Sequence, residues 1–254
     1  MDLPPALEAA WGLRDQPRKG PKPGLTLTKI VEAAIRLADR DGLDAVSMAR
    51  VAAELGAAPM SLYRHITSKD DLLELMTDTA WGPPPAPLTG TWREQLAQWA
   101  RNMRQGMYAH PWTLRVPVSG LPVYPNNVAW FEQGLAALAD TPISEQHKPW
   151  TLLLISGYVR NEVMTGSDMA ATIRTQAAAA EDLKAAGTVG EQLDPGTAWA
   201  RQYRDLMVKL ADPVRFPATA RLLESGVFDI ADVPDEEFDF GLDRILDGIE
   251  CLIK

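Results

Sequence analysis

The stretch LGAAPMSLYRHITSKDDLL, residues 55–73, decides the fold because it holds one helix end, a tight turn and two further helix starts. Gly56 lies where the tight turn is expected, and Pro59 suits a first helical position, which needs no amide donor. Ser68 can cap the following helix, SKDDLLELMTDTAW, and Ser47 can cap the preceding one, SMARVAAEL. Two short helices joined by a glycine-containing turn predict a helix-turn-helix.

The second short helix, expected over about Pro59 to His65, has the side chains needed to enter a DNA major groove about 12 Å wide. Leu62 and Ile66, four residues apart, would face the domain core. The remaining side chains can meet base edges or phosphates, although Tyr63 could instead be a core aromatic and His65 an ordinary surface histidine. The candidate DNA contacts from this reasoning are Met60, Ser61, Tyr63, Arg64, His65 and Lys69.

Three segments together, SMARVAAELG (47–56), SLYRHI (61–66) and Lys69 with Leu72–Leu73, resemble the DNA-binding signature of the tetracycline-repressor (TetR) family. The resemblance covers about residues 26–81. It implies a three-helix DNA-binding domain on a larger helical domain that binds a small-molecule inducer and dimerises. It also implies DNA contacts at Ser47, Pro59, Met60, Ser61, Tyr63, His65 and Lys69. Residues 58–60 are Ala, Pro and Met, without a long amide side chain, so no operator sequence is predicted.

Charge is unevenly distributed along the 254 residues, whose net charge is −9. Residues 18–69 carry nine Lys/Arg and five Asp/Glu, whereas residues 70–254 carry 15 Lys/Arg and 26 Asp/Glu. This division indicates a small basic module on an acidic body, although scatter alone can produce such a difference. An acidic body would repel phosphates and confine DNA to the basic end.

Beyond the motif, apolar residues recur at helical spacing and no useful strand pattern is found, so the chain is expected to be all-α. The segment GPPPAP, residues 82–87, is the best domain boundary. We expect a flexible basic arm over 1–24, a helix-turn-helix DNA-binding domain over 25–82 and a helical ligand-binding and dimerisation domain over 88–254. The arm contains RKGPKPG and could enter a minor groove or remain a solvated tail.

The larger domain is rich in aromatic residues, which could form either core or the lining of an apolar pocket with a few polar groups. HPW (110–112) and GYVRNEV (157–163) resemble helix ends that line the family's cavity. A bulky, flat, partly apolar inducer would suit this composition. The candidate ligand-binding residues are Met103, His110, Trp112, Asn127, Trp130, Phe131, Trp150, Tyr158, Asn161 and Glu162.

The last segment, DEEFDFGLDRILDGIECLI, has an apolar stripe. With the helix from Glu145 to Gly166 it resembles the four-helix dimer interface of the TetR family, although the stripe could instead pack on its own body. A two-fold dimer would place two recognition helices about 34–36 Å apart, which favours a homodimer on a palindromic operator. Cys251 is expected to be a small buried residue. The candidate interface residues are Phe238, Leu242, Ile245, Leu246 and Ile249.

Other functions find little support in the sequence. His65, His110 and His147 have no metal-ligand spacing, and no GxSxG, phosphate-binding glycine loop or C-x-x-C occurs. We therefore expect no enzyme activity, metal or cofactor. The absence of a secretory signal, of a long apolar run and of paired cysteines favours the cytoplasm. The predicted function is a repressor released by a small molecule; the alternative is the same fold controlled by a protein partner, or an activator.

Overall fold

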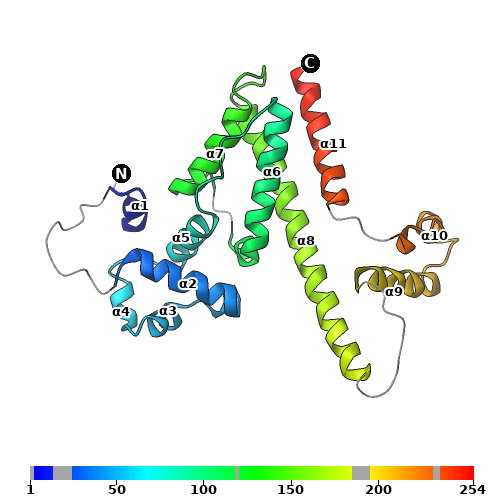
Figure 1. The fold of residues 1–254 in the computed structure, drawn as a ribbon, viewed down its shortest axis with the longest axis horizontal. Coiled ribbons are helices and arrows are strands. Elements are labelled where there is room, and N and C mark those ends of the chain that lie inside the picture. The colour runs from blue at the N-terminus through cyan, green and yellow to red at the C-terminus, as the bar shows by residue number, and fades with distance from the viewer. Residues whose placement is uncertain (1–2, 14–24, 118–119, 185–194, 231–234) are drawn as a thin grey trace. The chain divides into compact units, whose positions relative to one another are not determined.

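The computed structural model describes residues 3–13, 25–117, 120–184, 195–230 and 235–254, and its regular structure in these ranges is entirely helical (Figure 1). The prediction of an all-α chain is confirmed. Among the described helices, none is long and apolar enough to span a membrane. The helices are α1 Pro5–Ala10, α2 Leu27–Asp41, α3 Met48–Glu54, α4 Pro59–Leu62, α5 Lys69–Trp81, α6 Trp92–Ala109, α7 Pro125–Ala137, α8 His147–Lys184, α9 Pro195–Leu210, α10 Pro217–Glu224 and α11 Glu236–Ile253, with 3-10 turns η1 Leu43–Ala45, η2 Pro111–Arg115 and η3 Val227–Asp229.

The chain divides into two compact units, each described here by itself. The first contains the described residues up to Met164 together with Ile245–Lys254, and the second contains Thr165–Arg244. In the second unit, Tyr203 of α9 stacks on Trp199 at 5.7 Å and meets the ring of Phe228 in η3. Arg204 pairs with Asp229 at 2.5 Å, which ties α9 to η3. All candidate DNA-binding and ligand-binding residues lie in the first unit.

The DNA-binding module is built from α2, α3, α4 and α5, and side-chain caps begin three of these helices. The oxygens of Thr26, Ser47 and Ser68 accept the backbone N–H groups of the third residues that follow them, at 3.3, 3.2 and 3.0 Å. Such caps satisfy amides that have no partner inside the helix. Helix α2 buries one face, formed by Ile30, Val31, Ala33, Ala34, Leu37 and Ala38.

The turn between α3 and α4 requires Gly56, whose φ of +62° is strained for residues with a Cβ. Helix α4 ends at Leu62, earlier than the predicted His65, and hydrogen-bonded turns continue the chain to Ile66. Leu62 and Ile66 are fully buried, as predicted from their spacing. They anchor an otherwise exposed segment to the core of the module.

Residues 5–10 form a helix where the sequence analysis expected a flexible arm over residues 1–24. Pro5 occupies the first turn of α1, and Ala6 is fully buried in the cluster that also contains the side chains of α2 and α5. Trp11 Nε1 donates to the carbonyl of Val123 at 2.8 Å. Six residues are too few to show a helical period in the sequence. The RKGPKPG segment lies outside the described residues.

The body of the first unit is built on α6, α7 and the first half of α8. Helix α6 begins with a capping box, in which Thr91 N donates to Glu94 Oε2 at 2.8 Å. Trp99 Nε1 donates to the carbonyl of Trp130 at 3.0 Å, joining α6 to α7. Gly134 of α7 lies directly against Leu152 of α8, so α7 and α8 approach closely there.

Helix α11 buries the apolar stripe that was predicted to form a dimer interface. Phe238, Leu242, Leu246 and Ile249 are buried within the chain itself, and Ile245 is half-buried, because the helix packs on its own protein. Asp247 pairs with Arg93 of α6 at 2.8 Å, on the polar edge of the same helix. This burial favours the alternative that the stripe packs on its own body. Cys251, expected to be buried, is exposed.

The contact at Gly134 can be tested by substitution. A Cβ there would lie 2.9 Å from both terminal carbons of Leu152 and 3.1 Å from Trp99 Cε2. We expect Gly134→Ala to lower the free energy of unfolding by roughly 1 kcal/mol net, because overpacking outweighs the gain in helix propensity. The matched control is Gly106→Ala in α6, where a Cβ meets no atom within 4 Å; it should be neutral or stabilising in urea unfolding. Equal stability of the two variants would contradict the tight packing.

Candidate DNA-binding interface

The segment from Pro59 to His65 presents its side chains to solvent in the way a DNA-reading element requires. Met60 is 74% exposed and Tyr63 is 48% exposed, although both are large apolar side chains. Pro59 and Arg64 are also exposed, while Ser61 and His65 are half-buried. Leu62 and Ile66, on the opposite face, anchor the segment to the core of the module. The exposed side chains are therefore not needed to form that core.

The serine hydroxyl groups near this surface already make one hydrogen bond each within the protein. Ser61 Oγ donates to the carbonyl of Ala58 at 2.6 Å, which leaves its lone pairs free to accept. Ser47 Oγ accepts the amide of Arg50 and keeps its own proton to donate to a phosphate. Lys69 is exposed at the first position of α5, beside Asp70 and Asp71.

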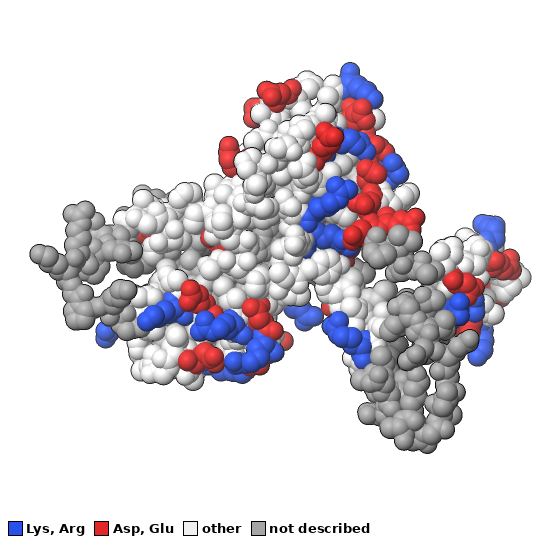
Figure 2. Space-filling model, in the orientation of Figure 1, with Lys and Arg blue, Asp and Glu red and all other residues white. Residues whose placement is uncertain are grey.

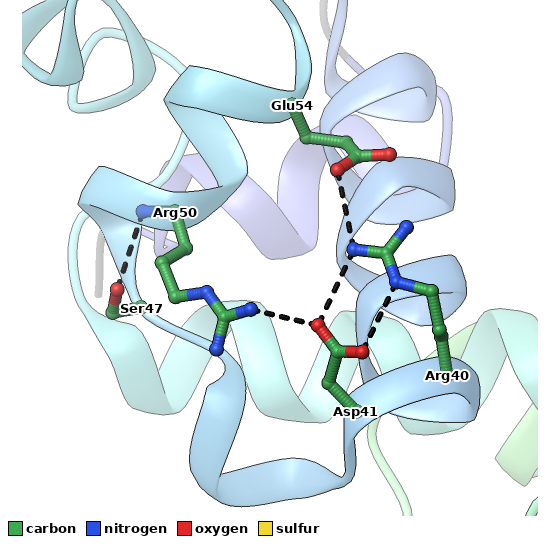
Figure 3. A network of polar contacts seen from close by, with 5 residues as sticks. All are labelled: Arg40, Asp41, Ser47, Arg50 and Glu54. Carbon is green, nitrogen blue, oxygen red and sulfur yellow. Dashed lines mark hydrogen bonds and ion pairs between the residues drawn. The ribbon is translucent and has the colours of Figure 1, made fainter.

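Acidic side chains accompany the basic ones over the DNA-binding module, as the interleaved blue and red atoms in Figure 2 show. Arg50 of α3 pairs with Asp41 at 2.7 Å, and Arg40 bridges Asp41 at 3.1 Å and Glu54 at 3.5 Å (Figure 3). The Arg40 guanidinium beside Asp41 holds the pKa of that carboxyl below its usual range. The four charges cancel, so this corner contributes no net positive charge.

The chain between α6 and α7 packs into the DNA-binding module. Asp39 Oδ1 of α2 contacts His110 Nδ1 at 2.8 Å and accepts Trp112 Nε1–H at 2.6 Å. Trp112, Val116 and Tyr124 are buried in the same apolar cluster as the side chains of α2, α3 and α5. His110 and Trp112 were predicted to bind ligand; the structure instead places them against the DNA-binding helices.

A second aspartate ties the other end of this connecting chain to α5. Asp78 is buried, and its carboxylate accepts the backbone N–H of Asn127 at 2.8 Å and the side chain of Asn126 at 3.1 Å. Burial raises the pKa of Asp78, and the hydrogen bonds from the two asparagines oppose that rise. Asn127, another predicted ligand residue, therefore has its backbone amide engaged with α5.

The other predicted ligand residues differ in exposure. Met103 and Trp130 are buried, while Phe131, Tyr158 and Glu162 are half-buried in the body. Both oxygens of Glu162 are bound by the guanidinium of Arg104, at 3.0 and 2.8 Å. Trp150, 56% exposed, and Asn161 lie on the outward face of α8, away from any interior site.

Buried side-chain atoms without a hydrogen-bond partner in the described part of the chain include two in the first unit that the sequence analysis missed. They are Trp81 Nε1 at the end of α5 and Gln133 Oε1 in α7. The Trp81 ring meets Trp130 edge-on at 5.7 Å, and Gln133 follows Trp130 by one turn. Buried polar atoms normally have hydrogen-bond partners, so each of these two atoms could take one from a bound molecule. No pattern in the sequence distinguishes these residues from ordinary core.

Comparisons with known proteins agree with this geometry. The family model for bacterial regulatory proteins of the tetR family matches residues 30–76, and that for the tetracyclin repressor-like C-terminal domain matches residues 84–253. The chain is 34% identical over 256 residues to the HTH-type transcriptional repressor DrrR1 of Streptomyces coeruleorubidus, covering 99% of this chain and 87% of that relative. The crystal structure of the Streptomyces coelicolor TetR family protein ActR in complex with actinorhodin aligns with a TM-score of 0.68 at 27% identity, over 89% of this chain and 97% of ActR.

A helix-turn-helix with an exposed recognition surface, carried on a helical body, defines a DNA-binding transcriptional regulator. Since one family model spans residues 84–253 and a full-length relative exceeds 30% identity, the chain belongs to the TetR family. The resemblance inferred from the sequence motifs is confirmed. The individual DNA contacts remain predictions.

The role of Lys69 can be measured by DNA binding at several salt concentrations. We expect Lys69→Ala to weaken binding to all duplex sequences and to reduce the slope of log affinity against log salt by about 1 per bound module, because each module loses one phosphate contact. Lys209→Ala removes a lysine that is also exposed, from α9 outside the module, and serves as the control. Equal slopes for the two variants would show that Lys69 does not contact phosphate.

The raised pKa of Asp78 predicts a pH dependence of stability. The carboxyl group of Asp78 binds a proton more tightly in the folded state than in the unfolded chain, where its pKa is about 4. The free energy of unfolding should therefore rise as pH falls from neutral through the raised pKa towards that value. We expect the Tm of the wild type minus that of Asp78→Asn to increase over this range in thermal melts. A difference that shrinks on acidification would contradict the buried carboxylate.

Proposed function

We propose that the protein is a repressor that binds a palindromic operator as a homodimer and is released from it by a bulky, flat, partly apolar molecule. The observation that carries this proposal is the connection between α6 and α7, where Asp39 of α2 accepts a hydrogen bond from Trp112 and Asp78 of α5 accepts one from Asn127. Through it, a change among the body helices reaches the recognition segment. Similarity to the repressor DrrR1 over nearly the whole chain supports repression.

The effector site is proposed around Trp81, Trp130 and Gln133. An effector there would accept a hydrogen bond from Trp81 Nε1 and donate one to Gln133 Oε1, two of the buried side-chain atoms that have no hydrogen-bond partner among the described residues. A ring system bearing hydroxyl and carbonyl groups meets both needs and matches the aromatic surroundings. The relative ActR was crystallised with actinorhodin, which supports a small-molecule effector for this chain as well.

The protein is released from DNA if the effector has a higher affinity for the conformation that cannot bind DNA than for the conformation that can. Trp81 is the last residue of α5, and Trp130 Nε1 donates to the carbonyl of Gly82, the next residue, at 3.0 Å. A molecule inserted beside these rings would shift α5, and α5 packs against α2 in the DNA-binding module. In a dimer this shift changes the separation of the two recognition segments.

The dimer interface is proposed on the outward face of α8, in place of the buried stripe of α11. This face presents large apolar side chains at helical spacing, and Gly157, where a Cβ would meet no atom within 4 Å, allows a partner helix to approach closely. On α11, Cys251 and Leu252 are exposed and could extend the contact. The exposed residues of the α8 face are Trp150, Leu153, Leu154, Gly157, Asn161 and Met164.

Selection of bound fragments from random DNA, followed by displacement with compounds found in a thermal-shift screen, tests the function directly. We expect Trp81→Phe, which keeps a ring but removes the N–H, to raise the effector concentration needed for release by roughly tenfold. Its DNA affinity without effector should stay unchanged. Trp92→Phe in α6 is the control. If no compound released DNA from the wild type, control by a protein partner, or activation, would be favoured.

The interface is tested by Leu153→Asp, since Leu153 is 67% exposed and can be changed without disturbing the core. We expect monomers by light scattering, with unchanged helicity and lower operator affinity. The control is Leu121→Asp, which places the same charge at a leucine exposed outside α8 and should remain dimeric. A dimeric Leu153→Asp protein would rule out this face.

A further inference from the structure

Four charged side chains form a connected network between the end of α2 and helix α3 (Figure 3). Asp41 lies at its centre: its Oδ2 accepts Arg50 Nη2 at 2.7 Å and Arg40 Nη2 at 3.3 Å, and its Oδ1 accepts Arg40 Nε at 3.1 Å. Arg40 also reaches Glu54 at 3.5 Å. None of the four has a role in the proposed set of DNA contacts.

The position of Arg50 places it towards DNA. In a helix-turn-helix, the first helix crosses the sugar–phosphate backbone while the second enters the groove. Here the first helix is α3, whose exposed side chains are Ala49, Arg50, Ala53 and Glu54. Arg50 is the cation among these four, and its side chain is 52% exposed.

Exchange of Asp41 for a phosphate is energetically reasonable. An exposed ion pair contributes little to stability, whereas a guanidinium and a phosphate form charge-assisted, often bidentate hydrogen bonds. When Arg50 leaves, Asp41 keeps the two hydrogen bonds from Arg40, so its charge stays neutralised and repels the approaching backbone less. The guanidinium of Arg40 lowers the pKa of Asp41, which keeps this carboxylate ionised as a competitor.

We infer that Arg50 contacts the DNA backbone and that Asp41 is its intramolecular competitor, held in place by Arg40. The inference rests on the proposed DNA-binding role of α3 and α4. Each binding event exchanges a carboxylate for a phosphate oxygen on Arg50. Competition by Asp41 therefore lowers the affinity for every DNA sequence. Discrimination between sequences then depends on the recognition segment.

The experiment uses the full-length protein and a random-sequence duplex of about 30 base pairs, with affinity measured over a range of salt concentrations. We expect Arg50→Gln to weaken binding several-fold and to lower the salt slope by about 1 per bound module. Asp41→Asn should strengthen binding several-fold. Asp44→Asn, which removes an exposed carboxylate from η1, reports the general effect of losing one negative charge.

The double variant, Asp41→Asn with Arg50→Gln, decides between competition and bulk charge. Competition requires that the gain from Asp41→Asn exceed that from Asp44→Asn and disappear when residue 50 is glutamine. A gain that persists in the double variant, or an Arg50→Gln protein that binds like the wild type, would overturn the inference while leaving the proposed function intact. A wild type that does not hold the duplex at low salt would refute DNA binding itself.

Discussion

The insertion of Trp112 into the DNA-binding core is the constraint on which the first unit depends. Its indole nitrogen donates to Asp39 at 2.6 Å, and its ring belongs to the same buried cluster as the side chains of α2, α3 and α5. Residues that follow α6 in the sequence therefore complete the hydrophobic core of a module that the sequence alone divides off at GPPPAP. The domain boundary predicted from the sequence therefore does not coincide with the set of residues that form the hydrophobic core of this module.

The connecting chain is also held on its other sides. Arg160 of α8 donates to the carbonyls of Leu114 and Val116, and desolvation lowers the pKa of its guanidinium. Asp78 of α5 holds the start of α7. Helices of the body and helices of the DNA-binding module thus both hydrogen-bond to the connection between α6 and α7, so displacement of either set changes hydrogen bonds made by this connection.

The sequence predicted the local elements well and the long-range contacts poorly. Caps at Ser47 and Ser68, the turn at Gly56 and the inward pair Leu62 and Ile66 depend on neighbours within a few residues, so spacing reveals them. The contact between Asp39 and Trp112 joins residues 73 positions apart, and neither residue type signals the pairing. The stripe on α11 showed that the helix buries one face but not which surface covers it. Lone residues such as Trp81 and Gln133 carry no pattern at all.

The brevity of α4 has an evolutionary consequence. This one-turn helix is secured by Leu62 and Ile66, while Pro59, Met60 and Tyr63 project into solvent. Substitutions at the projecting positions remove no buried contacts, so they cost little stability, and on the proposed DNA contacts they would alter what the protein reads. After gene duplication, paralogues built on this scaffold can diverge towards new target sites one exposed residue at a time, with their folding left intact.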